Sequence, residues 1–334
     1  MQTTLSDMAR RSGWIALLAA ALFLAQAAFA AELPSTDSGT PAAQPPKDYR
    51  RIISFSPAVT ETIYKLGGQD RLVGVASFSD FPPEAEKEKP TVGGILNIDS
   101  EKVLSLKPDL IISPPGAIAS EKLPQFGADV KFLPDKTLED VCNSFVEIGR
   151  LVGKSAEGAE LADAFAGAVD AAVKRNAGRA RVGVLVVIGY EPMWVAGGYG
   201  VVNDLLHAAG GQNVAGKVEK DFYQMDFESV LQSAPEVIVD VTLHAAITAE
   251  KRAPVVSFWR RFGTVPAAKN GAIEFLDTDL LTIPGPRLID GLAGLEKALH
   301  GQDGKPRTGA GVTPPGVTPQ GESTAPERSA CDAR

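Results

Sequence analysis

Cysteine and histidine are scarce in this chain. Its 334 residues include two cysteines and three histidines, too few for a disulfide-rich scaffold or a Cys/His zinc cluster. Positive charge is not in excess either, because 33 Lys and Arg stand against 41 Asp and Glu, a formal charge of −8. Nucleic acids and anionic lipids attract clustered Lys and Arg, so the balance argues against both as main partners.

The sequence motifs of common enzymes are also missing. We find no Gly-x-Ser-x-Gly turn, no Gly-x4-Gly-Lys-Ser/Thr phosphate loop and no His-Glu-x-x-His. Of the histidines, only His244 follows a predicted strand. An exported α/β hydrolase that uses His244 with Asp240 or Asp277 is therefore the distant alternative. We expect a binding protein that is not an enzyme, with no resident cofactor and no metal of its own.

The two ends of the chain differ in composition from the middle. Arg10 and Arg11 precede an apolar run that leads to Ala28-Phe29-Ala30, which predicts a signal peptide over residues 1–30, cleaved near Ala30. Residues 31–49 and 301–334 are poor in large apolar side chains, and we expect a disordered linker and a disordered tail there. This predicts a periplasmic protein with no direct membrane insertion after cleavage.

Two segments of the chain match one another. Glu101–Ile112 and Glu228–Val239 share a short amphipathic helix, a proline, an acid and an apolar strand, at a constant offset of 127 residues. Leu66-Gly67-Gly68-Gln69 and Ala209-Gly210-Gly211-Gln212 form a second pair in the same order. The repetition predicts two related α/β lobes with central, mostly parallel sheets.

Between the lobes the pattern becomes helical. Apolar residues recur at steps of three and four from Leu138 to about Lys174, with Gly153 as a point where the helix breaks or bends. We predict an N-terminal lobe over 50–137, a long helical connector over 138–175, as one rod or two consecutive pieces, and a C-terminal lobe over 176–300. A stiff connector would limit hinge motion between the lobes.

Ligands of open parallel sheets bind beyond the carboxyl ends of the strands. The segments that follow the predicted strands carry aromatic and short polar side chains and few charges, which is typical of a site for a large, partly apolar molecule. The candidate ligand-binding residues there are Phe55, Ser56, Phe78, Asp80, Pro115, Tyr190, Trp194, Tyr223, His244 and Asp279.

Glu101 and Glu228 occupy equivalent positions of the two repeats. Each can stabilise the positive end of its own helix, or the two together can form a symmetric pair of contacts to a basic partner. The residues alone leave both interpretations open.

Several motifs, taken together, resemble a known family. They are Arg51–Glu61, Leu72–Val75, Ser79–Pro83, Val92-Gly93-Gly94 and Leu106–Leu110, in that order. The succession resembles the periplasmic substrate-binding proteins of ABC importers for cobalamin, iron–siderophores and haem. It implies two α/β lobes joined by a long helix, a ligand held between them with little closure, and glutamates on each lobe, here Glu101 and Glu228, that dock into arginine pockets of the inner-membrane permease.

The resemblance is nearest to the cobalamin-binding branch, through Ser79–Pro83 and Pro284–Arg287. It implies ligand contacts at Phe78, Trp194, Tyr223 and Asp279, and Ile95 stands where that branch has an aromatic contact. We therefore expect a monomer that carries a corrinoid or another metal chelate to an ABC importer. A ferric siderophore or haem is the alternative cargo.

Overall fold

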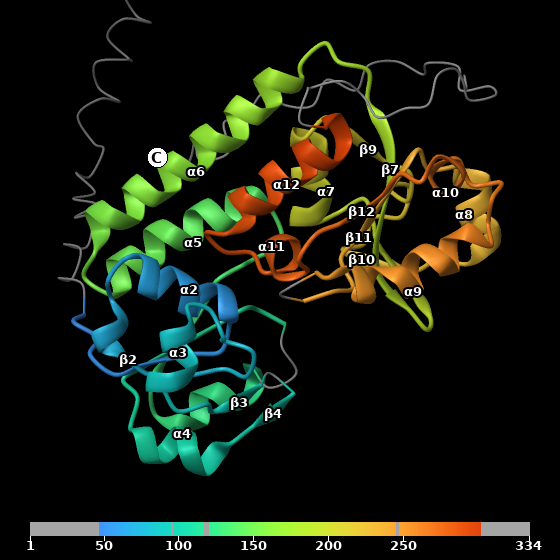
Figure 1. Ribbon diagram of the computed structural model, residues 1–334. Coiled ribbons are helices and arrows are strands. Elements are labelled where there is room, and N and C mark those ends of the chain that lie inside the picture. The colour runs from blue at the N-terminus through green and yellow to red at the C-terminus, as the bar shows by residue number, and fades with distance from the viewer. Residues whose placement is uncertain (1–46, 95, 117–119, 245–246, 302–334) are drawn as a thin grey trace, which may run out of the picture. The chain divides into compact units, whose positions relative to one another are not determined.

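The computed structural model describes residues 47–94, 96–116, 120–244 and 247–301 (Figure 1). The predicted signal peptide, most of the predicted linker, the tail from residue 302 and the candidate Ile95 lie outside these ranges. Within them, none of the helices combines the length and the apolar character that a membrane span needs.

The N-terminal lobe is built on a parallel sheet. Its four strands have the order β2-β1-β5-β6, and every neighbouring pair runs parallel. These strands are β1 (Ile52–Ser54), β2 (Leu72–Val75), β5 (Leu110–Ser113) and β6 (Asp129–Phe132). The helices are α2 (Pro57–Lys65), α3 (Pro83–Glu88) and α4 (Ser100–Leu106), and β3 (Gly93–Gly94) pairs antiparallel with β4 (Asn97–Ile98).

The C-terminal lobe has a larger, mixed sheet of the order β10-β8-β7-β11-β12, with β9 also paired to β7. Its strands are β7 (Val182–Tyr190), β8 (Met193–Ala196), β9 (Gly211–Asn213), β10 (Phe222–Gln224), β11 (Val237–Asp240) and β12 (Ile273–Phe275). Its helices are α7 (Val201–Ala208), α8 (Phe227–Ser233), α9 (Ala249–Arg260), α10 (Pro266–Asn270), α11 (Asp279–Thr282) and α12 (Leu288–His300).

The repeat seen in the sequence is a repeat of topology. Strands β9, β7, β11 and β12 pair in parallel, in the same order as β2, β1, β5 and β6 of the N-terminal lobe. The antiparallel strands β8 and β10 are an addition to the C-terminal lobe. The predicted α/β class with two related lobes is thus confirmed.

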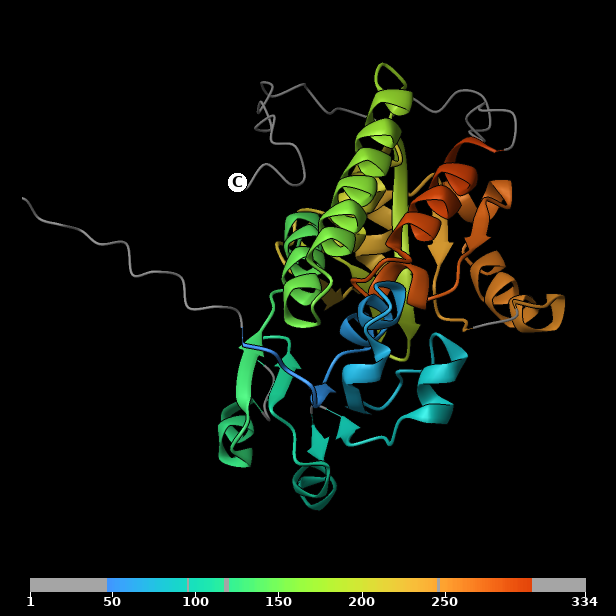
Figure 2. The same ribbon diagram turned by 90° about the vertical axis from the view of Figure 1, so that its left-hand side faces the viewer.

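The predicted connector folds as two helices and not as one rod. α5 (Leu138–Leu151) and α6 (Ser155–Asn176) are separated by Gly153, whose φ of +74° suits glycine. The two helices lie side by side in both views (Figures 1 and 2). They approach so closely that a Cβ placed on Gly149 would lie 2.9 Å from the Cα of Gly158.

Helix α5 packs into the hydrophobic cores of both lobes. Val141 and Phe145 join α6, α7, α12 and one face of the C-terminal sheet. One turn further on, Ile148 and Leu151 join the core that covers β1 and β5 of the N-terminal lobe. Because one helix is buried in both cores, a change in the angle between the lobes would disturb close-packed contacts.

Candidate functional site

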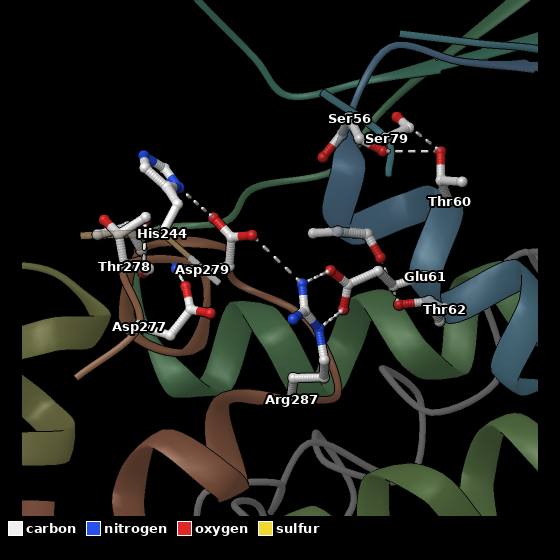
Figure 3. A network of polar contacts seen from close by, with 12 residues as sticks. Ser56, Thr60, Glu61, Thr62, Ser79, His244, Asp277, Thr278, Asp279 and Arg287 are labelled. Atoms are coloured by element: carbon white, nitrogen blue, oxygen red, sulfur yellow. Dashed lines mark hydrogen bonds and ion pairs between the residues drawn. The ribbon is translucent and has the colours of Figure 1, made fainter. Parts of the chain in front are cut away.

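A buried ion pair joins the two lobes. Arg287, just before α12, donates from Nε and Nη2 to the two carboxylate oxygens of Glu61 on α2, at 3.0 and 2.5 Å (Figure 3). The Glu61 side chain is 3% exposed and that of Arg287 is 16% exposed. The guanidinium also lies 4.1 Å from the ring centroid of Phe81. Arg287 therefore links the C-terminal lobe to two segments of the N-terminal lobe.

A second ion pair crosses the same junction. Lys136, at the start of the connector, lies with its Nζ 2.6 Å from Oδ2 of Asp221 in the C-terminal lobe. Both residues line a recess of about 70 Å³ together with Tyr199 and Pro284. A smaller recess of about 10 Å³, lined by Ser56 and again by Pro284, lies beside it. Small-molecule sites usually enclose about 300–1,000 Å³, so a large ligand would have to contact the outer rim of this junction.

Acidic side chains gather beside Arg287. Oδ2 of Asp279 lies 4.0 Å from Nη2 of Arg287, while its Oδ1 lies 3.5 Å from Nδ1 of His244 (Figure 3). The backbone N–H of Asp279 donates to Oδ1 of Asp277 at 3.1 Å. One ligand atom from each of His244, Asp277 and Asp279 lies within 4.8 Å of the others, so this group could hold a metal ion.

Two carboxyl groups of this region have a raised pKa. Burial raises the pKa of Asp279, and the charges of Asp277 and Asp80 raise it further. Burial also raises the pKa of the Glu61 carboxyl, an effect that the Arg287 guanidinium opposes. The charges of Glu61, Asp277 and Asp279 thus act on one guanidinium, and the excess of negative charge disfavours an anionic ligand.

Most of the predicted ligand-binding residues lie on the surface, where a ligand can reach them. Phe78 is 86% exposed and Trp194 is 37% exposed. Phe78 also has a φ of 65°, which is uncommon for a residue other than glycine. Asp80, Pro115 and His244 are exposed, Asp279 is half-buried, and Ser56 is buried at the smaller recess.

Three of the predicted ligand-binding residues direct their side chains into or onto the hydrophobic cores. Phe55 is 1% exposed and lies in the core of the N-terminal lobe, so a ligand cannot reach its side chain in this structure. The Tyr190 hydroxyl donates to Asp240 at 2.5 Å and accepts from Nε1 of Trp259 at 2.7 Å. Tyr223 packs on the core of the C-terminal lobe.

The orientation of Tyr223 follows from strand alternation. In the antiparallel pair β8 and β10, Trp194 lies opposite Gln224, and Tyr223 lies opposite Val195. Successive side chains of a strand point to opposite faces, so Trp194 and Tyr223 lie on different sides of the sheet. The structure brings His244 and Asp279 into contact, but it does not place Trp194 and Tyr223 on a common rim.

The sequence interpretation missed the ion pair at the centre of the junction. Arg287 belongs to the Pro284–Arg287 motif and Glu61 to the Arg51–Glu61 motif, and neither motif indicates that the two side chains pair. A usable signal was the position of Glu61 in α2, because residues 58–63 are all buried and a buried carboxylate requires a partner. The identity of that partner, 226 residues away, had no local signal.

The helices that carry Glu101 and Glu228 have the same construction. Asp99 caps α4 by accepting from the backbone N–H of Lys102, and Asp226 caps α8 by accepting from that of Ser229. Each helix is seven residues long. Both glutamates are exposed, and neither forms an ion pair with another described residue. Each lobe thus presents one acid at the same position of the same helix.

Fold, repeat and site together define a two-lobed solute-binding protein. Residues 52–280 match the family described as periplasmic binding protein, and the chain belongs to this family.

Three relatives show the range of the similarity. The chain is 28% identical to a vitamin B12-binding protein of Vibrio parahaemolyticus over 247 residues, which cover 72% of this chain and 86% of that protein. The crystal structure of the periplasmic vitamin B12-binding protein of Vibrio cholerae matches with a TM-score of 0.66 and 26% identity, covering 75% of this chain and 96% of the other. That of a periplasmic heme-binding protein from Pseudomonas aeruginosa matches with a TM-score of 0.66 and 28% identity, covering 77% and 95%.

The resemblance read from the sequence is thereby confirmed at the level of the family. The relatives are substrate-binding proteins and not enzymes, and one of them, from Bacillus subtilis, is described as an ABC transporter substrate-binding lipoprotein.

Proposed function

We propose that this protein binds a corrinoid at the rim of the junction between its lobes and delivers it to an ABC importer in the inner membrane. The similarity to vitamin B12-binding proteins over 72% of the chain carries the proposal. The exposed rings of Phe78 and Trp194 supply the apolar contacts that a macrocycle needs. In this proposal the protein acts as a monomer in the periplasm after removal of residues 1–30.

The charge at the junction supports a corrinoid over the alternative cargoes. Haem and most ferric siderophores carry carboxylates or other anionic groups, whereas the corrinoid periphery carries amides. The charges of Glu61, Asp277 and Asp279 act on one guanidinium, so an anionic cargo would add repulsion there. His244 and Asp279 provide polar contacts to an amide-rich rim.

A titration of the purified protein with cyanocobalamin tests the cargo. We expect calorimetry to give a dissociation constant below about 1 µM. Trp194→Ala should weaken binding about tenfold or more, because an exposed ring that becomes buried contributes on the order of 1.5–3 kcal/mol. Val173→Ala, at a position 50% exposed on α6, is the matched control and should bind as the wild type does.

The outcomes separate the candidate cargoes. The protein could instead fail to bind cyanocobalamin below about 10 µM and bind haem or a ferric siderophore tightly. That result would make haem or the siderophore the cargo, and the protein would still be a binding protein of the same family. If Trp194→Ala bound cyanocobalamin with unchanged affinity, the proposed binding of the cargo at the rim of the junction would be refuted.

Delivery is proposed to depend on Glu101 and Glu228. Exposed acids that form no ion pair with another described residue can pair with basic side chains of a permease, and their two-fold repetition suits two such pockets. The double variant Glu101→Arg, Glu228→Arg should bind cyanocobalamin as the wild type does but abolish its uptake into cells. Normal uptake by this variant would refute the docking role.

A further inference from the structure

Helix α9 begins with two neighbouring cations. Lys251 and Arg252 lie in its first turn, after the cap that Thr248 provides, and both are exposed. The positive end of the helix dipole favours acids in the first turn, such as Glu250, and disfavours cations. The two cations therefore do not contribute to the stability of the helix through this dipole.

Neither cation forms an ion pair with another described residue. The Lys251 side chain approaches the carbonyl oxygen of His244, with its Nζ at 3.5 Å. The Arg252 guanidinium lies 5.3 Å from the ring centroid of Phe275. Both side chains are thus held against the C-terminal lobe by uncharged groups, and their charges are available to a bound molecule.

These contacts place the first turn of α9 beside the candidate site. His244 follows β11, and Phe275 ends the neighbouring parallel strand β12, two residues before Asp277. The segments after the two strands are joined, because the backbone N–H of Thr278 donates to the carbonyl oxygen of Leu243 at 3.2 Å. The two cations therefore lie next to the acidic part of the proposed cargo site.

The chemistry of a corrinoid offers one group that these cations fit. A corrinoid with a complete nucleotide loop carries a single phosphodiester, while its other peripheral groups are amides. The acids near Arg287 disfavour a cargo with several carboxylates, but one phosphodiester can be placed at the first turn of α9. Arginine binds phosphate oxygens through two parallel hydrogen bonds, and lysine binds them as a point charge.

We propose that Lys251 and Arg252 bind the phosphodiester of the nucleotide loop, so that the protein prefers a complete corrinoid to a precursor that lacks this group. The inference rests on the proposed binding of a corrinoid and adds the residues that set the preference. Phe78 and Trp194 would contact the macrocycle, which the complete corrinoid and its precursor share, whereas the first turn of α9 contacts the group by which they differ.

Calorimetry of the purified protein with three corrinoids tests the assignment. Dicyanocobinamide has no phosphate, dicyanocobinamide phosphate has the phosphate without the nucleotide base, and cyanocobalamin has both. We expect the double variant Lys251→Gln, Arg252→Gln to bind the two phosphate-bearing corrinoids about tenfold more weakly than the wild type, because each exposed charge contributes about threefold. The affinity of this variant for dicyanocobinamide should be unchanged.

Two variants are controls. Arg260→Gln, Arg261→Gln removes the same charge from the other end of α9 and should bind all three corrinoids as the wild type does. Lys251→Arg, Arg252→Lys keeps both charges and should keep the preference for phosphate. Equal weakening for all three corrinoids in the first variant, or unchanged affinity for the phosphate-bearing two, would overturn the inference and leave the proposed function standing. If the wild type bound none of the three, the proposed function would fail, and this inference with it.

Discussion

Replacement of Arg287 by alanine tests how strongly the buried ion pair stabilises the contact between the lobes. The substitution leaves the Glu61 carboxylate, 3% exposed in its side chain, without its bidentate partner. It also removes the cation from the face of Phe81. The remaining charge lies near the carboxyls of Asp279 and Asp80.

The expected cost follows from the burial of the pair. Loss of one partner of a buried pair costs about 3–5 kcal/mol, and because Arg287 keeps some solvent contact, we expect about 3 kcal/mol. The cost should shrink as the pH falls from 7 towards 5. Burial raises the pKa of Glu61, so the folded variant takes up a proton more readily than the unfolded chain and regains stability on acidification.

Urea unfolding at pH 7 and pH 5 measures both effects. Arg175→Ala is the matched control, because Arg175 also pairs with a carboxylate, Glu296, but is 55% exposed, and its loss should cost about 0–1 kcal/mol. The double variant Glu61→Gln, Arg287→Met should recover most of the stability, since no unpaired charge remains. A cost no larger than that of Arg175→Ala, or a double variant as unstable as Arg287→Ala, would refute the reasoning.

Two further predictions concern the connector. Gly158→Ala should destabilise the protein by about 1–3 kcal/mol in urea unfolding, because the new Cβ would lie 2.7 Å from the carbonyl oxygen of Phe145. Gly167→Ala is the control on the same helix and should not destabilise the protein, because its Cβ would meet open space. Hydrogen bonds from Arg150, with help from Lys131, lower the pKa of Glu147 to about 2, so its stabilisation is present above the ordinary value of 4.5 and is lost as the pH falls towards 2. Glu147→Gln should flatten the pH dependence of stability in that window by about 1 kcal/mol, a value reduced for solvent screening; an unchanged slope would contradict the assignment.

Local signals predict the helix and strand elements of the internal repeat. The repeated acid, helix, proline and apolar run predicted α4 with β5 and α8 with β11, because caps and apolar periodicity depend on neighbouring residues only. The motif Leu72–Val75 coincides with β2. The sequence predicts a connector of one rod or two pieces, since a glycine can bend a helix or end it, and packing decides.

Features that depend on distant pairing could not be predicted. Tyr190 and Trp194 are expected in a segment that follows a strand, yet β7 continues to Tyr190 and turns back at Met193 into β8. Tyr223 is expected in such a segment too, but it lies in β10, whose existence depends on pairing with β8. The Glu61–Arg287 pair likewise depends on how the two lobes meet, and neither apolar periodicity nor a helix cap predicts that contact.

The repeat is preserved on helices α4 and α8 and is lost where the C-terminal lobe adds β8 and β10. On the outer helices the offset of 127 holds for the cap, the acid, the buried valine, the exposed leucine and the left-handed end. The C-terminal lobe has the added β8 and β10, with Trp194 on β8, whereas the N-terminal lobe has Phe78 on a loop. The proposed cargo is a single asymmetric molecule, which does not require equal contacts from the two lobes. The difference between the lobes at Trp194 and Phe78 therefore agrees with the proposed binding of one corrinoid, while α4 and α8 keep the repeat.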